Sequence, residues 1–108
     1  MNTIPYYCDT PAIQHLCALY GPRWEAMPLS ARTDILALLS IAANFLCVEG
    51  ETQRLDELAD AFGIEFPDEA IPDALSDLDG ELNGIQDALM LIAGIAQTTP
   101  PQILEQAA

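Results

Sequence analysis

The sequence predicts an all-α protein, a compact bundle of four to five helices. Signals for β-strands are nearly absent along the 108 residues, whereas helix caps and helix stops recur at short intervals. Apolar residues also recur every three or four positions, which is the spacing of one helical face. Short connections between such segments are typical of a helical bundle, so we expect a single domain over residues 1–108.

The first predicted helix begins at Pro11. Thr10 precedes it as an N-cap, and proline is favoured at the first helical position. One helical face then carries four residues at i, i+3, i+4 and i+7, namely Ile13, Leu16, Cys17 and Tyr20. Gly21 followed by Pro22 is expected to end this helix.

A largely apolar central helix is predicted from about residue 31 to about residue 48, with Ser30 as its cap and Gly50 as its stop. It is apolar nearly all round, with Ile35, Leu36, Leu38, Leu39, Ile41, Phe45, Leu46 and Val48. A helix without a polar face is buried in a core or in an oligomer interface. Its apolar stretch is shorter than the roughly 20 residues of a membrane span, so we expect a core helix and no membrane insertion.

The third predicted helix begins at Thr52. Its apolar face consists of Leu55, Leu58, Ala59 and Phe62. Gly63 is expected to end it in a left-handed conformation, and Ile64 is the apolar residue that often follows such a stop.

A long helix is predicted over about residues 72–97, opened by Pro72. Its apolar residues step by three and four in alternation, which is a heptad pattern: Leu75, Leu78, Leu82, Ile85, Leu89, Ile92 and Ala96. A second stripe, four residues apart, is small: Ser76, Gly80, Gly84 and Ala88. Glycine inside a helix costs about 1 kcal/mol relative to alanine, so the stripe suggests that another backbone comes close there. We expect the seam to pack within a monomer, with a homodimer as the alternative, and a short last helix to follow Pro100 and Pro101.

The overall charge excludes several classes of partner. The chain has 17 acidic residues, three arginines and no lysine, for a net charge of −14, yet 51% of its residues are hydrophobic. High charge with this much apolar content predicts a folded chain rather than a disordered one. Direct binding to nucleic acid is not expected, because phosphate contacts need lysine and arginine. An anionic membrane surface is excluded by the same charge.

The acidic residues are concentrated in the segment 49–87. We take its acidic residues as the candidate partner-binding site: Glu49, Glu51, Asp56, Glu57, Asp60, Glu65, Asp68, Glu69, Asp73, Asp77, Asp79, Glu81 and Asp87. Several of them are four residues apart, where like charges each destabilise a helix by about 0.2–0.5 kcal/mol. Asp73 lies in a first turn, where the helix dipole favours it, but Glu81 and Asp87 have no such local reason.

Three explanations of this segment compete. The acids form a solvated face that keeps the protein soluble, they reflect adaptation to high salt, or they dock onto a basic partner. Adaptation to salt would spread the charge over the whole surface and lower the apolar content. The concentration in one segment therefore favours docking.

Carboxylates four residues apart on a helix are about 6 Å apart along its axis, a line of negative charge comparable with that of DNA phosphates. In size and charge, though in no sequence motif, the chain resembles the DNA-mimic inhibitors that phages and mobile elements direct against host defence or transcription proteins. Anti-restriction and anti-CRISPR proteins are examples. The resemblance implies a non-enzymatic inhibitor or regulator that blocks a basic, nucleic-acid-binding protein. The alternative is a small helical adaptor or immunity-type module that binds through an apolar face, either the small stripe or the surroundings of Trp24, with the acid serving solubility.

Enzymatic, metal-binding and cofactor-binding motifs are not found. Gly80 does not make a calcium loop, because Leu75 and Gln86 stand where carboxylate-type ligands belong. The single His15 does not lie on the same helical face as Cys17, so a Cys–His nucleophile pair is not expected. The cysteines and His15 match no common zinc spacing. We therefore expect no enzyme, no metal and no cofactor.

The three cysteines, Cys8, Cys17 and Cys47, are an odd number, and no signal peptide is visible, which favours a reducing, cytoplasmic location. Trp24, Tyr6 and Tyr7 stand near prolines, and we expect core positions for them rather than interface hot spots.

Overall fold

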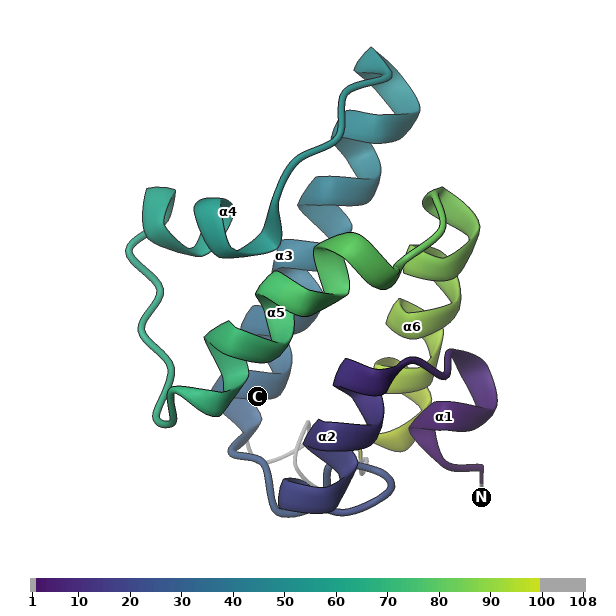
Figure 1. The fold of residues 1–108 in the computed structure, drawn as a ribbon, viewed down its shortest axis with the longest axis vertical. Coiled ribbons are helices and arrows are strands. Elements are labelled where there is room, and N and C mark those ends of the chain that lie inside the picture. Colours follow the sequence, from purple (N-terminus) through teal and green to yellow (C-terminus); the bar gives the residue numbers. More distant parts are fainter. Residues whose placement is uncertain (1, 100–108) are drawn as a thin grey trace.

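Six helices make up the part of the chain that the computed structural model describes, residues 2–99 (Figure 1). They are α1 (Ile4–Tyr7), α2 (Pro11–Tyr20), α3 (Leu29–Glu49), α4 (Leu55–Ala61), α5 (Ala70–Glu81) and α6 (Ile85–Thr98). The all-α prediction is confirmed and residues 2–99 contain no strand, but they form six helices where four to five were expected. The short helix expected after Pro100 lies outside the described residues.

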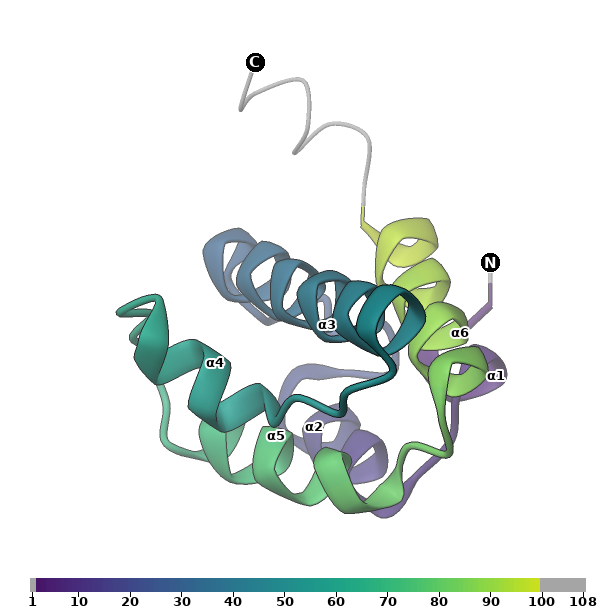
Figure 2. The ribbon, with the colours of Figure 1, turned by 90° about the horizontal axis from the view of Figure 1, so that it is seen from above.

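Within the described residues, the long α3 packs mainly against α6 and α4. The α6 helix lies against α3, α5 lies across α2, and α1 lies against α6. The short α4 packs on α5 and α3, on the side of the molecule opposite α6 and α1 (Figure 2). The largest fully buried side chains form one core between these layers: Trp24, Ile4, Ile13, Leu16, Ile35, Leu38, Leu39, Leu55, Ile71, Leu75, Leu78 and Leu91.

The predicted limits of α2 are confirmed. The Ile13 amide donates a hydrogen bond to the Thr10 Oγ1 at 3.3 Å, as an N-cap should. Gly21, with φ +99°, ends the helix and donates to the Cys17 carbonyl at 2.8 Å. The preceding α1 was not predicted, because four residues are too short to show a period. Its Tyr7 packs closely on α6, where a methyl group added to Gly94 would lie 3.0 Å from the Tyr7 Cβ.

The central helix is confirmed, although it spans 29–49 and its N-cap position is held by Pro28 rather than Ser30. One side of it forms the core, whereas its C-terminal turns project beyond the other helices (Figure 1). Val48, near that end, is 72% exposed, so the helix is not buried all round. By length and composition α3 is apolar enough to cross a membrane, a criterion that core helices of soluble proteins also meet.

The predicted long helix over 72–97 is wrong, because the chain breaks at residues 82–84 and continues as a separate helix. Leu82 is extended and Gly84 has φ +83°, a left-handed conformation that glycine adopts readily. A continuous helix of that length would be about 39 Å long, more than the 36 Å of the longest dimension of the fold. Breaking it lets α5 cover α2 while α6 covers α3, so the heptad seam is divided between two packing surfaces.

The small stripe has a different role from the one expected. A methyl group at Gly80 or Gly84 would meet no atom within 4 Å, so no other backbone approaches either glycine. Gly84 instead permits the turn between α5 and α6. The close approach is at Gly94, outside the predicted stripe.

The α4 helix begins at Leu55, three residues later than expected. Its predicted end is confirmed, since Gly63 has φ +67° and the Ile64 amide donates to the Ala59 carbonyl at 2.9 Å. Phe62 was expected on the buried face but is 60% exposed, because it falls at the C-cap, past the last turn that packs on the core.

A buried arginine connects α3 to the end of α6. Arg32 is 2% exposed, and its guanidinium donates to the carbonyls of Arg23, Trp24 and Ile95 at 2.6–3.0 Å. It also donates to the hydroxyls of Thr98 and Thr99 at 2.8–3.3 Å. Burial lowers the pKa of Arg32, and the negative charge of Glu25 opposes that effect. The C-terminus of α6 carries no basic residue of its own, so Arg32 supplies the cation that its helix dipole favours.

Candidate functional site

A shallow groove of about 550 Å³ runs between α4 and α5, and we call it the acidic groove. It is lined by Asp56, Ala59, Asp60, Ile64, Glu65, Phe66, Pro72, Asp73, Leu75 and Ser76. Four of the predicted site residues therefore come together here, from two helices and the connection between them.

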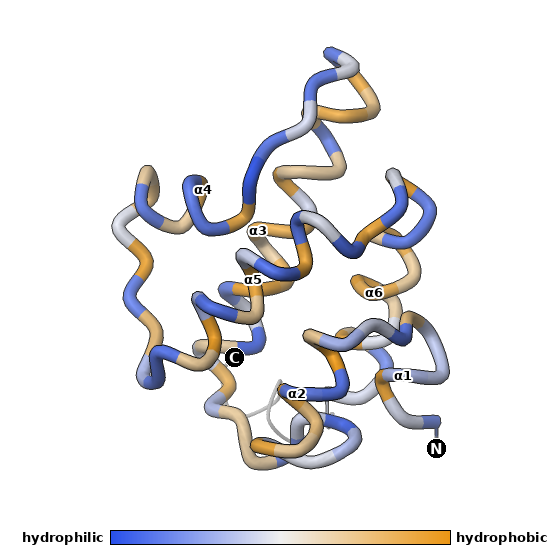
Figure 3. Tube along the Cα trace, in the orientation of Figure 1, coloured by the Kyte–Doolittle hydropathy of each residue, from blue (hydrophilic) through white to orange (hydrophobic). Residues whose placement is uncertain are grey.

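The carboxylates line the acidic groove on several sides. Asp56 and Asp60 stand one turn apart on α4, a rise of about 6 Å, while Asp73 stands on the first turn of α5 and Glu65 on the connection. Asp60, Glu65 and Asp73 are exposed, and none of them forms an ion pair within residues 2–99. The linker before α4 is one of the hydrophilic stretches of the trace, whereas α4 itself alternates between hydrophilic and apolar residues (Figure 3).

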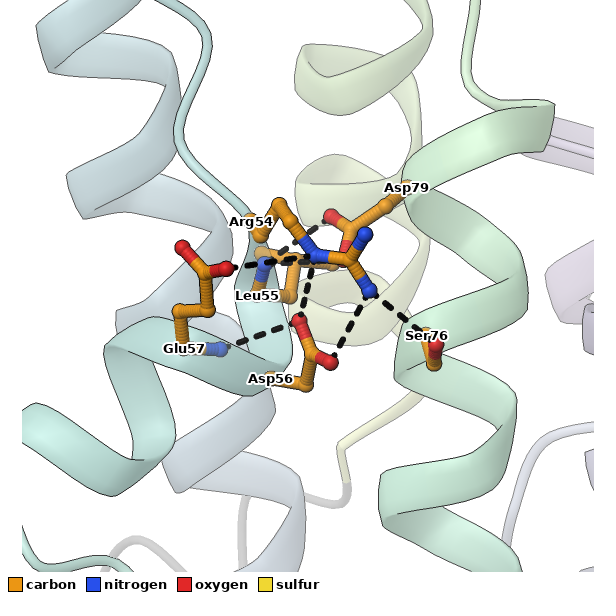
Figure 4. A network of polar contacts seen from close by, with 6 residues as sticks. All are labelled: Arg54, Leu55, Asp56, Glu57, Ser76 and Asp79. Carbon is orange, nitrogen blue, oxygen red and sulfur yellow. Dashed lines mark hydrogen bonds and ion pairs between the residues drawn. The ribbon is translucent and has the colours of Figure 1, made fainter.

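Arg54 joins Asp56 on α4 to Ser76 on α5, two residues that line the acidic groove (Figure 4). Its Nε and Nη2 donate to the two carboxylate oxygens of Asp56, each at 3.1 Å, and Nη2 also reaches the Ser76 Oγ on α5 at 3.4 Å. The hydrogen bond from Arg54 is the main reason that the pKa of Asp56 lies below its usual value. A weaker ion pair at 3.8 Å joins Arg54 to Glu57. Arg54 thus balances Asp56 and leaves the other three groove carboxylates uncompensated.

Asp79 has a structural role beside the groove. Both of its carboxylate oxygens accept the Leu55 amide at 2.9 and 3.0 Å, which caps the N-terminus of α4 from a different helix (Figure 4). Burial raises the pKa of Asp79, and the hydrogen bond from Leu55 opposes that rise. Asp79 also lines a second, smaller pocket of about 190 Å³ between α3 and the junction of α5 with α6.

Glu81 and Asp87 both hold backbone amides. The expectation that neither has a local reason is wrong for Asp87, whereas the contact of Glu81 comes from a helix distant in sequence. The Glu81 Oε1 accepts the Ala12 amide at 3.0 Å, at the first turn of α2. The Asp87 Oδ2 accepts the Asn83 amide at 2.8 Å. Because the long helix breaks, Asp87 lies in the first turn of α6, where the helix dipole favours a carboxylate.

The thirteen candidate residues therefore fall into three groups. Four line the acidic groove: Asp56, Asp60, Glu65 and Asp73. Six are exposed elsewhere: Glu49, Glu51, Glu57, Asp68, Glu69 and Asp77. Three are half-buried and hold backbone amides: Asp79, Glu81 and Asp87. Among the exposed six, Asp68 also accepts the Ala70 amide at 2.9 Å and the Tyr20 hydroxyl at 3.2 Å.

The three cysteines are free thiols that differ in burial: Cys8 is buried, Cys17 is half-buried and Cys47 is exposed. Burial is the main cause that raises the pKa of the Cys8 and Cys17 thiols, which lowers the thiolate fraction that a nucleophile needs. Within residues 2–99, no three histidine, cysteine or acidic side chains are placed to share a metal ion.

The two features considered for an apolar adaptor lie in different environments. Trp24 is fully buried, in a turn where it has φ +51°, which confirms a core position. The small stripe is interrupted where α5 ends. The core position expected for Tyr6 is wrong, because Tyr6 is 69% exposed; it lies edge-on to Tyr7, with ring centroids 5.2 Å apart.

Sequence reasoning missed the apolar lining of the acidic groove. Ile64 was assigned only to the stop of a helix and Phe66 was not singled out, yet both are half-buried against the core and line the groove. The available signal was the apolar residue at every second position, Phe62, Ile64 and Phe66, inside the acidic segment.

No protein family, curated protein or solved structure matches this chain. Its function is therefore argued from its own residues.

Proposed function

We propose that this protein is a non-enzymatic, acidic binding protein that docks onto a basic, nucleic-acid-binding partner and blocks it. The observation that carries the proposal is the acidic groove, which Asp60, Glu65 and Asp73 line from α4, α5 and the connection between them, without an ion pair to any of the three within residues 2–99. Of the three arginines, Arg32 is buried in the core and Arg54 is engaged with Asp56, so neither neutralises these carboxylates.

Further exposed carboxylates extend the same negative surface. Asp77 continues the row of Asp73 along α5, and Glu57 lies beside the groove residues of α4. Such a field steers a basic partner and speeds association, in a manner that salt weakens. A partner held in this way would have its basic surface covered, so the mechanism is steric and electrostatic blocking without turnover.

The test uses the protein as bait in a nuclease-treated lysate, followed by affinity measurement on the captured partner. We compare the wild type with Asp73→Asn/Asp77→Asn, which removes two exposed charges whose side chains form no hydrogen bond or ion pair within residues 2–99. The matched control is Gln86→Lys/Gln97→Lys, which changes the net charge equally on exposed positions of α6. Glu81 is left unchanged, because it caps α2.

The proposal predicts that the double Asn variant binds the partner more weakly while the Lys control binds nearly as the wild type does. A double-stranded DNA oligonucleotide should compete with the protein for the partner. Binding that persists unchanged at about 1 M salt, where the Debye length is about 3 Å, would contradict the proposal. Equal binding by both variants would instead favour an adaptor that uses an apolar surface.

A further inference from the structure

The acidic groove has an apolar floor beneath its charged rim. Ala59 and Leu75 are buried core residues at its base, and Ile64 and Phe66 are half-buried beside them. Pro72 adds a further apolar surface from α5. A face that served only solubility would not need a hollow in which large apolar side chains are open to solvent.

We propose that the acidic groove binds a basic amphipathic helix of the partner, with large apolar side chains on the floor and lysine or arginine at the rim. This inference rests on the proposed function and specifies the partner element that the groove receives. The acidic groove offers two kinds of complementarity at one place, with carboxylates for a basic partner and apolar side chains for an apolar one. A flat surface rich in lysine and arginine would satisfy Asp60, Glu65 and Asp73, but it would leave Ile64 and Phe66 without an apolar contact.

A helix is the element that fits the geometry. Residues 2–99 contain no strand, so they offer no sheet edge for strand addition, and a groove between two helices accepts an amphipathic helix. The volume of about 550 Å³ lies within the roughly 300–1,000 Å³ that is typical of ligand sites. The seven-residue α4 is about 10 Å long, which corresponds to about two turns of a bound helix. Two anchors at i and i+4, about 6 Å apart, match that length.

The charges also give the bound helix a direction of approach. Arg54 joins Asp56 to Ser76, two residues of the groove lining, so a cation of the partner is repelled near that pair. Glu65 lies on the connection that follows α4, away from Arg54. The basic residues of the partner are therefore expected near Asp60, Glu65 and Asp73 rather than near the N-terminus of α4.

The test uses two synthetic helical peptides as probes, of equal length and equal positive charge. One carries leucine at i and i+4 on its apolar face, and the other carries serine at both positions. Fluorescence anisotropy gives the dissociation constant of each peptide at low salt and at about 1 M salt. We expect the leucine peptide to bind at least about tenfold more tightly, an advantage equivalent to about 1.4 kcal/mol that persists when charge is screened.

Three variants locate the site. Phe66→Ala should reduce the advantage of the leucine peptide, whereas Asp73→Asn should weaken both peptides equally. Gln97→Lys is the matched control, because it changes the net charge equally at an exposed position of α6 that does not line the acidic groove. Amide chemical-shift mapping on the wild type provides a readout that does not depend on the folding of a variant, with the largest shifts expected at Ala59 and Ile64.

Equal affinity of the wild type for both peptides would overturn the inference while leaving the electrostatic proposal intact. Shifts centred outside the acidic groove, or the absence of binding by the leucine peptide, would also overturn it. The proposed function fails separately if the captured partner binds Asp73→Asn/Asp77→Asn as tightly as it binds the wild type.

Discussion

Arg32 is the residue whose replacement tests most directly how this fold is held together. It lies near the start of α3 and joins three parts of the chain: its own helix, the turn at residues 23–24 and the end of α6. The perturbation is Arg32→Met, which keeps an unbranched apolar stem and removes the guanidinium. We predict a large loss in the free energy of unfolding, although no ligand and no ion pair are involved.

The magnitude follows from the contacts. Six hydrogen bonds of 2.6–3.3 Å run from Arg32 to three carbonyls and two hydroxyls. A hydrogen bond to a charged group contributes about 1.5–3 kcal/mol net, and the sum is offset by the cost of several kcal/mol for burying the charge. Some acceptors keep a second donor, since the Met27 amide also donates to the Trp24 carbonyl at 3.0 Å. We expect a net loss of about 3–5 kcal/mol, typical of breaking a buried charged network.

The assay is thermal and urea unfolding followed by circular dichroism. For a chain of this size, about 4 °C in Tm corresponds to 1 kcal/mol, so Arg32→Met should melt about 12–20 °C lower. Arg32→Lys is the matched variant, because it keeps the charge but replaces the planar fork with a point charge. It should lose nearly as much stability, since one ammonium cannot serve both the turn and the end of α6.

A free energy of unfolding of Arg32→Met within about 1 kcal/mol of the wild-type value would contradict this prediction. That result would mean that the cost of burying the guanidinium cancels its hydrogen bonds, as replacements of some buried ion pairs by apolar residues have shown. Recovery of wild-type stability by Arg32→Lys would refute the narrower point that the geometry of the fork matters.

Three further predictions concern stability. Glu81→Ala should lower the free energy of unfolding by about 0.5–2 kcal/mol, because it removes a cap from α2. Asp77→Ala should change it by no more than about 0.5 kcal/mol. Comparable losses of both variants in urea unfolding would contradict the capping role. Gly94→Ala should destabilise the fold by about 1–3 kcal/mol, because its methyl group would crowd α1, while Gly80→Ala should stabilise it by about 0.4–1 kcal/mol; the opposite order of Tm values would exclude the close contact. The raised pKa of Asp79 means that the folded state binds its proton more readily than the unfolded chain, so this group lowers stability as pH rises from about 4. The difference in the free energy of unfolding between Asp79→Asn and the wild type should therefore shift in favour of the variant as pH rises from about 4 to about 7. A difference that stays constant over that range would contradict the burial of the charge.

Local signals in the sequence predicted the parts of the fold that local chemistry decides. The side-chain oxygen of Thr10 accepts an amide at the start of α2, and the positive φ of Gly21 ends the helix. Both effects need no residue from elsewhere in the chain. The stop at Gly63 was predicted for the same reason. The core side of α3 also followed from its composition, since an apolar helix has few alternatives to burial.

Periodicity could not predict the break between α5 and α6. The apolar spacing continues through Leu82 and Ile85, so the pattern alone is that of one helix. The break is decided by packing, because α5 and α6 bury their apolar residues against different partners, and Gly84 makes the necessary turn possible. The same break gives Asp87 a helix N-terminus that the sequence pattern did not show.

The sequence by itself determined the helical class, several helix ends and the concentration of charge in the segment 49–87. Only the tertiary structure decided which acids serve the fold and which remain open to a partner. Asp79 and Glu81 hold amides of helices that are distant in sequence, while Asp60 and Asp73 line the acidic groove from two different helices. The physical reason is that a carboxylate looks the same in sequence whether it faces water or an unpaired amide, and only the packing of other helices supplies that amide.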